Sequence, residues 1–166
     1  MPSIKSQRGW IQYAFAVFSL LLGLVTVLLG IDGINQRGFY HLWSWCFLVV
    51  GAVAIHSTVE EVTATYTASP SHLEINHLFK RDFVSWEDID EANALPNFFG
   101  QNNLGIRINE RRRIFLHTAF LSNTELLNQT IIEYAYLNNS SVNVNGLTRG
   151  IYGQPPYGIF DPKADS

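Results

Sequence analysis

Residues 11–31 read IQYAFAVFSLLLGLVTVLLGI, and this stretch decides the architecture of the chain. It contains thirteen Leu, Ile, Val or Phe residues, and its only ionisable side chain is the phenol of Tyr13. At about −0.3 to −0.6 kcal/mol each on an insertion scale, these residues favour the membrane by about 4 to 8 kcal/mol before the polar residues subtract. At ~1.5 Å per residue the stretch also spans the ~30 Å hydrocarbon layer, so it predicts a membrane-spanning helix.

A second apolar stretch follows after a short polar segment. Residues 32–38 read DGINQRG, and residues 39–55 again carry no formal charge. Because so short a connection joins antiparallel neighbours, the sequence predicts a helical hairpin over residues 11–59. A signal peptide would instead have a shorter apolar core followed by a small-residue cleavage site. Close approach of the two helices is possible at Gly23, Gly30 and Gly51.

The residues that flank the hairpin suggest its topology. Lys5 and Arg8 precede it, whereas the connecting segment carries Arg37 together with Asp32. This small excess of basic residues places both termini in the cytoplasm, with residues 1–10 as a cytoplasmic N-terminus. Indole rings prefer the headgroup level, so the expected interface anchors are Trp10, Trp43 and Trp45.

After residue 60 the hydrophobic pattern takes the period of β-strands. Short runs rich in β-branched and aromatic residues alternate with turn residues at intervals of roughly ten residues. Alternation is clearest where Leu104, Ile106 and Ile108 share one side of a strand. We expect a curved antiparallel meander built from TATYTA (63–68), HLEINHL (72–78), RDFVSW (81–86), IDEANAL (89–95), NLGIRIN (103–109) and RRIFLHT (112–118).

One amphipathic helix is expected to close this domain. Ser122 with Glu125 three residues later has the pattern of a capping box. Behind it, Leu127, Ile131 and Tyr134 give one apolar face, flanked by Leu126 and Leu137. A meander plugged at one end by a single helix is the pleckstrin-homology (PH) architecture. The predicted fold class is therefore an α+β membrane protein, in which a transmembrane hairpin precedes a PH-like antiparallel β-barrel or sandwich over residues 60–137.

The order of elements resembles the bacterial PH-like domain family of small membrane proteins. Two apolar helices lead into a strand, a short turn and then HLEINHLFKRDFVSWEDIDEANAL (72–95). In that family an aromatic or apolar residue, an acidic pair and Ile often lead into the next strand, as VSWEDID (84–90) does here. The resemblance covers about residues 63–137 and the hairpin. The layout also resembles the photosystem I assembly protein of thylakoid membranes, without a residue motif that decides for that family.

The acidic stretch RDFVSWEDIDE (81–91) raises the question of a metal or acid/base site. Its four carboxylates cannot all face one point in an extended chain, because alternation sends neighbours to opposite faces. We interpret the stretch as a solvated strand with a bend around Trp86 and Ile89, and we expect neither a cofactor nor a metal. The four carboxylates belong to Glu87, Asp88, Asp90 and Glu91.

Four arginines gather around the turn between the fifth and sixth runs, namely Arg107, Arg111, Arg112 and Arg113. They are either a solvated hairpin tip or a contact for anionic headgroups or a partner. The first strand turn, ASPSH (68–72), carries no basic residue, which disfavours inositol-lipid recognition. From Glu60 onward the chain has eight basic and thirteen acidic residues, which disfavours nucleic-acid binding.

Residues 138–166 form a tail rich in Asn, Gly and Pro. Such a composition is typical of disorder, yet the tail is unusually apolar for a free linker, so its own domain or a partner is expected to hold it. The candidate partner contacts are Ile151, Tyr152, Tyr157, Ile159 and Phe160.

These features predict a non-enzymatic, membrane-anchored interaction module, an accessory subunit or assembly factor of a larger membrane complex. The alternative is a domain that senses anionic lipid at the membrane surface. Expected partners are that complex and the bilayer, without nucleic acid. The expected location is a bacterial inner membrane, or a thylakoid membrane in a photosynthetic source. An enzyme is disfavoured because no catalytic set, phosphate loop or metal-ligand spacing appears.

Overall fold

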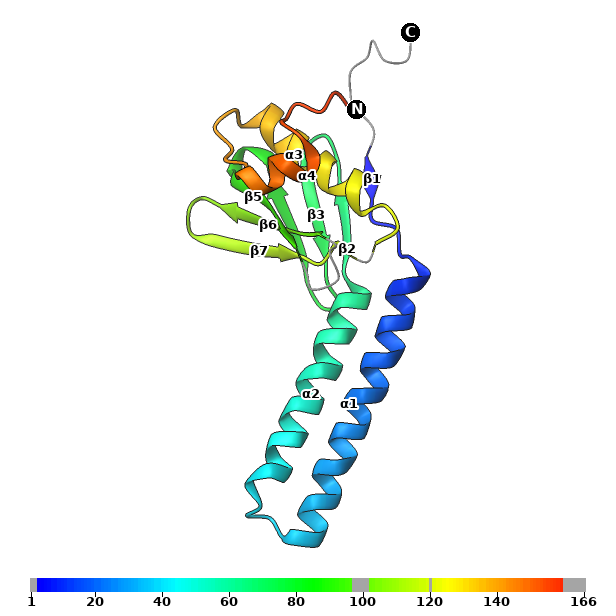
Figure 1. The fold of residues 1–166 in the computed structure, drawn as a ribbon. Helices are drawn as coiled ribbons and strands as arrows, with labels where there is room; N and C mark the ends of the chain where they lie inside the picture. Colours follow the sequence, from blue (N-terminus) through cyan, green and yellow to red (C-terminus); the bar gives the residue numbers. More distant parts are fainter. Residues whose placement is uncertain (1–2, 97–101, 120, 160–166) are drawn as a thin grey trace. The chain divides into compact units, whose positions relative to one another are not determined.

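The two apolar stretches form two long helices, α1 (Trp10–Arg37) and α2 (Leu42–Thr63) (Figure 1). This computed structural model describes residues 3–96, 102–119 and 121–159. Both helices are long and apolar enough to cross a membrane. Residues 9–63 make one unit of the chain, and residues 1–8 with 64–166 make the other.

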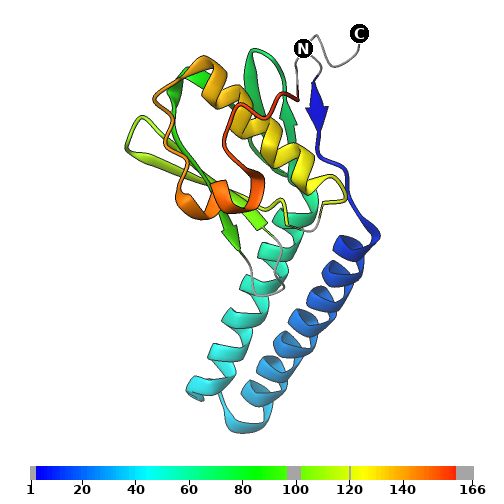
Figure 2. The same ribbon diagram turned by 45° about the horizontal axis from the view of Figure 1, so that its top comes forward.

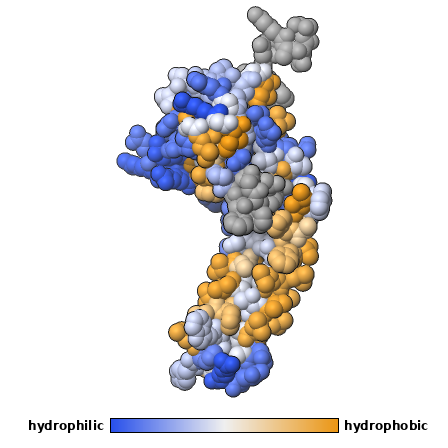
Figure 3. Space-filling model, in the orientation of Figure 1, coloured by the Kyte–Doolittle hydropathy of each residue, from blue (hydrophilic) through white to orange (hydrophobic). Residues whose placement is uncertain are grey.

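Small residues line the seam between α1 and α2, as predicted for three of its glycines. A Cβ added at Gly30 would lie 2.8 Å from the carbonyl oxygen of Ser44, and one at Gly51 would lie 2.8 Å from that of Gly23. The helix backbones therefore pack directly against each other at these levels. The large apolar side chains instead cover the outside of the hairpin, whose polar residues gather at its turn (Figure 3).

The strands of the other unit form two antiparallel sheets, with orders β1-β2-β3-β4 and β5-β6-β7. Each of the six predicted runs contains one observed strand. The prediction of a barrel is wrong for the described residues, because the two sheets remain separate and no barrel closes. The 3-10 turn η1 (Trp86–Asp88) carries the chain from one sheet to the next. The strands are β1 (Ile4–Lys5), β2 (Thr65–Ala68), β3 (His72–Asn76), β4 (Arg81–Ser85), β5 (Ile89–Pro96), β6 (Asn102–Ile108) and β7 (Arg112–Leu116).

Helix α3 (Thr124–Asn138) completes the core. It contacts η1, β1, β2 and β5, and so touches both sheets (Figure 2). The predicted face of Leu127, Ile131 and Tyr134 is fully buried, and the ring of Tyr134 packs 5.3 Å from that of Trp86. Trp86 also donates its indole N–H to the carbonyl of Ser69 at 2.9 Å. The apolar face of the helix therefore covers the bend that follows β4.

The N-terminal segment belongs to the β unit, which the sequence did not predict. Strand β1 pairs with β2, with Ile4 opposite Ala68 and Lys5 opposite Thr67. Asn123 holds the next residues, because its amide donates to the carbonyl of Lys5 at 2.9 Å and its Oδ1 accepts the N–H of Gln7 at 2.8 Å. Residues 4–7, within the predicted cytoplasmic N-terminus, are thus held by the β unit.

The predicted capping box at the start of α3 is wrong. The N-cap residue is Asn123, whose side chain makes no hydrogen bond to the first turn of the helix. Ser122 donates its hydroxyl to the carbonyl of Gln7 at 3.1 Å. Both side chains that could have capped the helix hold the N-terminal segment instead.

The tail covers the free edge of β5. Asn143 forms a parallel bridge there, since the N–H of Ala92 donates to its carbonyl at 3.1 Å and its own N–H donates to the carbonyl of Asp90 at 2.8 Å. Helix α4 (Gly146–Tyr152) follows, and the Thr148 hydroxyl accepts the N–H of Ala94 at 2.7 Å. Asn145 caps α4 by accepting the N–H of Thr148. Residues 138–159 are therefore part of the β unit, and the predicted domain end at residue 137 lies inside α3.

We expect Gly51→Ala to destabilise the helical hairpin by about 1–3 kcal/mol, because the added Cβ forces closely packed backbones apart. Thermal unfolding of the full chain in a neutral detergent measures the loss. Gly146→Ala is the matched control, since nothing lies within 4 Å of its added Cβ. Equal unfolding temperatures for the two variants would contradict the close approach of α1 and α2.

We expect Thr148→Val to lower the free energy of unfolding by about 1–3 kcal/mol, because the buried N–H of Ala94 loses its acceptor. Thr148→Ser keeps the hydroxyl and serves as the control. Denaturant unfolding of both variants measures the difference. A tail that did not belong to the folded unit would make the two substitutions indistinguishable.

Candidate functional site

The arginine-rich turn between β6 and β7 is the most charged feature that the sequence singles out. Asn109 and Glu110 both have left-handed backbone conformations, with φ of 47° and 56°. Such conformations cost roughly 1–2 kcal/mol for residues other than glycine. Two hydrogen bonds hold them: Asn109 N–H donates to the carbonyl of Asp88 at 3.0 Å, and Glu110 N–H donates to Oδ2 of Asp90 at 2.6 Å. The acidic stretch therefore fixes the shape of the arginine turn.

Two of the four arginines are engaged in ion pairs. Arg107 pairs with Glu91 on the neighbouring strand β5 at 2.9 Å. Arg112 pairs with Asp82 of β4 at 2.8 Å and so links the two sheets. Arg111 and Arg113 are exposed and have no ion pair among the described residues. The predicted four-arginine contact is thus reduced to two cations available for a ligand.

Hydrogen bonds from neighbouring side chains, charged and neutral, lower the pKa of two carboxyl groups on the first sheet. The pKa of Asp82 is lowered by a hydrogen bond from Lys80 and then by Arg112. The pKa of Glu74 is lowered first by the amide of Asn76 and also by Arg81, whose guanidinium lies 2.6 Å away. The edge strand β4 is therefore bounded by a mixed set of charges rather than by a positive surface.

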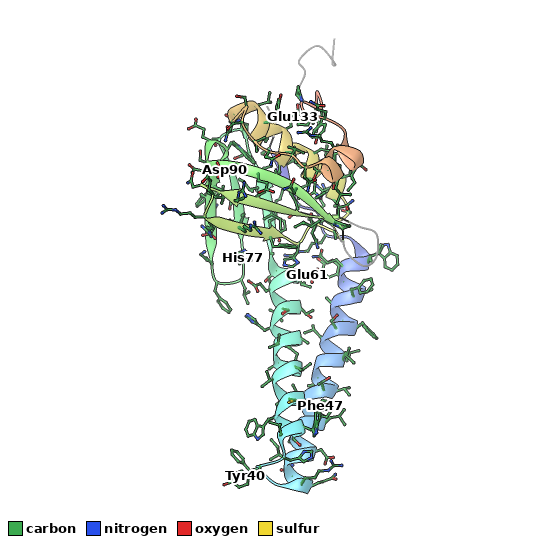
Figure 4. All side chains as sticks on the ribbon, turned by 60° about the vertical axis from the view of Figure 1, so that its left-hand side comes forward. Tyr40, Phe47, Glu61, His77, Asp90 and Glu133 are labelled. Atoms are coloured by element: carbon green, nitrogen blue, oxygen red, sulfur yellow. The ribbon has the colours of Figure 1, made fainter. Side chains whose placement is uncertain are left out.

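The carboxylates of the acidic stretch do not converge on one point, because they bind different partners. Glu87 is exposed, Asp90 (labelled in Figure 4) holds the β6–β7 turn, and Glu91 binds Arg107. The predicted bend residues Trp86 and Ile89 are both buried in the core. In the described part of the chain, no three His, Cys, Asp or Glu side chains are grouped to hold a metal ion.

Most of the tail residues predicted to contact a partner are used within the chain itself. Tyr152 is buried and accepts a hydrogen bond from Nδ2 of Asn128 at 2.9 Å. Tyr157 packs against the core, and burial raises its pKa to about 12. The backbone N–H of Ile159 donates at 3.3 Å to Glu133 of α3, a residue labelled in Figure 4. Tyr152 and Tyr157 are therefore packed in their own domain, and a partner contact at these two residues stays a prediction.

The two remaining tail residues that were predicted to contact a partner are Ile151 and Phe160. Ile151 is 37% exposed and remains accessible on α4. Phe160 lies outside the described residues.

The tryptophans expected at a membrane interface lie near the ends of the helices. Trp10 begins α1 and is 78% exposed, and Trp43 lies in the first turn of α2. Trp45 donates its indole N–H to the carbonyl of Phe39 at 2.7 Å, which ties it to the connection between the helices. Tyr40 in this connection is exposed as well (Figure 4). Their contact with a headgroup level stays a prediction.

The outer face of the second sheet carries a shallow hollow of about 210 Å³. Gly105 forms part of its floor, because a Cβ there would lie 2.6 Å from Cδ1 of Leu95. Phe115, Arg113 and the Glu91–Arg107 pair also line it. Of its charged side chains, Glu91 and Arg107 bind each other, and Arg113 has no ion pair among the described residues.

The sequence did not predict the exposed turn between β3 and β4. Leu78 is the last residue of the predicted strand 72–78, and Phe79 follows it. Leu78 is nevertheless 48% exposed and Phe79 is 91% exposed. A run of apolar residues cannot by itself distinguish a buried strand from an exposed tip. The HLFK segment (77–80) could have been found only from the combination of adjacent apolar residues with a basic end.

Comparison with known proteins gives no match: no protein-family model, curated protein or solved structure is similar to this chain.

We expect acid to weaken the link between β4 and β7. Because the pKa of Asp82 is lower in the folded than in the unfolded chain, its contribution to stability is present above the unfolded pKa and is lost as pH falls through the folded pKa. Thermal unfolding should therefore show that Asp82→Asn costs more stability at about pH 6 than at about pH 2, which lies below the ordinary pKa of ~3.9. The control Glu87→Gln should follow the unmodified chain at both pH values. A constant cost of Asp82→Asn across this range would contradict the role of the charge.

Proposed function

We propose that this protein is a non-enzymatic, membrane-anchored interaction module with a PH-like β unit, serving as an accessory subunit or assembly factor of a larger membrane protein complex. Helices α1 and α2 cross the bilayer as a hairpin. The membrane is a bacterial inner membrane, or a thylakoid membrane in a photosynthetic source, and the β unit lies on the cytoplasmic side.

The observation that carries this proposal is where large and small side chains lie on the hairpin: small ones face the other helix, and large apolar ones face outward. Small residues form the seam between α1 and α2, and only 17% of the most apolar 18-residue stretch of each helix is buried. Large apolar side chains such as Phe18, Leu21 and Val50, each at least 58% exposed, face outward. An exposed apolar surface of this extent is found where lipid or another protein covers it. In lipid, small residues at the interface are what allow two helices to associate.

The charge distribution along the hairpin favours an anchor over a transport path. Asp32 and Arg37 lie toward one end of the helix pair, and Glu60 and Glu61 lie toward the other. The middle of each helix contains no formally charged residue. Ionisable groups at depth are what mark ion or substrate pathways in membranes. A hairpin without them is suited to hold the β unit at the surface and to pack laterally against other helices.

The arrangement of the β unit supports the PH-like part of the proposal. Two antiparallel sheets meet over one core, and a single long helix packs against both, in the order that the sequence pattern predicts. The departure is that β7 does not pair with the first sheet: the hydroxyl of Tyr66 accepts the N–H of His117 at 3.0 Å in place of a ladder. PH-like units serve many roles, so the fold alone adds no argument for chemistry.

The second candidate function is sensing of anionic lipid by the arginine-rich turn between β6 and β7. A juxtamembrane cation contributes ~1 kcal/mol near an anionic surface. Because Arg107 and Arg112 already bind carboxylates, Arg111 and Arg113 supply the charge that remains. Two such contacts add to a membrane anchor, whereas by themselves they are a weak recognition site.

The decisive test is the size of the particle that the protein forms in its native membrane. We expect a tagged full-length chain to resist alkaline extraction and, in mild detergent, to migrate in a discrete complex much larger than 18.8 kDa. Gly51→Leu should release it from that complex, because separated helices lose their joint outer surface. The Gly146→Ala control should stay bound. Recovery of the unmodified chain as a lone monomer would overturn the accessory role, and release by alkali would overturn the membrane anchor.

A further inference from the structure

We infer that residues 77–80, the turn that joins β3 to β4, insert into the headgroup boundary of the bilayer. This inference rests on the proposed function, in which α1 and α2 cross that bilayer. It adds a second point of membrane contact, made by the β unit itself.

The turn exposes two adjacent apolar side chains that the fold does not use. Phe79 is 91% exposed and Leu78 is 48% exposed, while the core beside them is complete with Leu73, Ile75 and Val84 buried. The turn is well formed, because His77 donates its backbone N–H to the carbonyl of Lys80 at 2.7 Å. Single exposed apolar residues are common on proteins, but two at the tip of an ordered turn form a local apolar projection.

Strand register places this projection at the end of the sheet where the chain arrives from α2. Thr65, the first residue of β2, is paired with Asn76, the last residue of β3. Helix α2 ends at Thr63, so a single residue separates it from β2. Two residue steps span at most about 7 Å. Chain length alone therefore keeps the base of the turn close to the end of α2.

The end of α2 is itself the part of the helix that leaves the apolar layer. Its stretch without formal charge ends at Val59, and Glu60 and Glu61 follow directly, in the last turn of the helix. The headgroup regions add roughly 5–8 Å on each side of the hydrocarbon core. Since β3 runs antiparallel to β2, residues 77–79 extend beyond Thr65 by up to about 10 Å in the direction opposite to β2. That length is as great as the headgroup region is deep, so it is sufficient for an aromatic ring and a leucine in the turn to enter this boundary.

The basic residues around the turn are paired with carboxylates, so the proposed contact with the bilayer is apolar rather than electrostatic. Lys80 binds Asp82 at 2.8 Å, and Arg81 binds Glu74 at 2.6 Å while lying over the ring of Phe83. Both cations are thus neutralised within the β unit. Insertion should then depend on the apolar boundary and not on anionic lipid, which separates this contact from headgroup binding by Arg111 and Arg113.

Depth measurements with nitroxide labels on the full chain test the inference. Cys46 is the sole cysteine, so each label is placed on a Cys46→Ser background at one new cysteine. Phe79→Cys probes the turn, and Ser71→Cys probes the turn at the opposite end of β3. Leu21→Cys probes the outer face of α1. The protein is reconstituted in phosphatidylcholine nanodiscs, and collision with oxygen and with a water-soluble nickel chelate is measured for each label.

We expect the label at Phe79 to collide with the nickel chelate several-fold less often than the label at Ser71, and to do so equally when phosphatidylserine is added. The label at Leu21 should be fully shielded from nickel. A label at Phe79 as accessible as that at Ser71, with Leu21 shielded, overturns the inference and leaves the membrane anchor intact. Nickel access at Leu21 overturns the anchor itself. Shielding of Phe79 in native membranes but not in pure lipid also overturns the inference, because a protein would then cover the turn.

Discussion

The pairing of β1 with β2 is the constraint on which the rest of the structure depends. In the sequence, β1 precedes the helical hairpin and β2 follows it, yet Ile4 and Lys5 are in register with Ala68 and Thr67. The intervening residues 9–63 must therefore start and finish at the same sheet. Two antiparallel helices of similar length meet this requirement, whereas a single long helix would carry its two ends far apart. The β unit and the hairpin thus depend on each other through chain topology.

Closure of sheet edges explains why both chain ends have ordered roles. Each small sheet has free backbone groups along its outer strands, and such edges promote unwanted pairing unless they are covered. The N-terminal segment covers β2, and Asn143 with Thr148 satisfies β5. The outer strand β1 is only two residues long. The outer strands β4 and β7 carry charged residues, and the ion pair of Arg112 with Asp82 joins them. The β unit is thereby completed by its own chain, which leaves the apolar surfaces of the hairpin and of residues 77–80 for outside contacts.

The conspicuous charged motifs of this chain serve its structure. Asp88 and Asp90 hold the backbone of a turn whose left-handed residues would otherwise be strained. Glu91 neutralises Arg107 across the same sheet. The acidic stretch and the arginine-rich turn thus stabilise the β unit by binding each other. Apart from the exposed Arg111 and Arg113, the exposed features that the fold leaves for outside contacts are apolar, which is why the proposed function concerns membranes and partners rather than chemistry.

The sequence by itself determined the elements: two apolar helices, six of the strands and the buried face of α3. These depend on local periodicity, which persists whatever the chain packs against. Only the tertiary structure decided the role of the two chain ends, because a two-residue strand has no periodicity and an Asn/Gly/Pro-rich tail has the composition of disorder. It also decided that Ser122 and Asn123 bind the N-terminal segment instead of capping α3, since the choice among hydrogen-bond partners depends on which segment arrives nearby. Likewise, side-chain type singled out Arg107 and Arg112, but their ion pairs come from strands 16 and 30 residues away in sequence, where only the fold brings the carboxylates within reach.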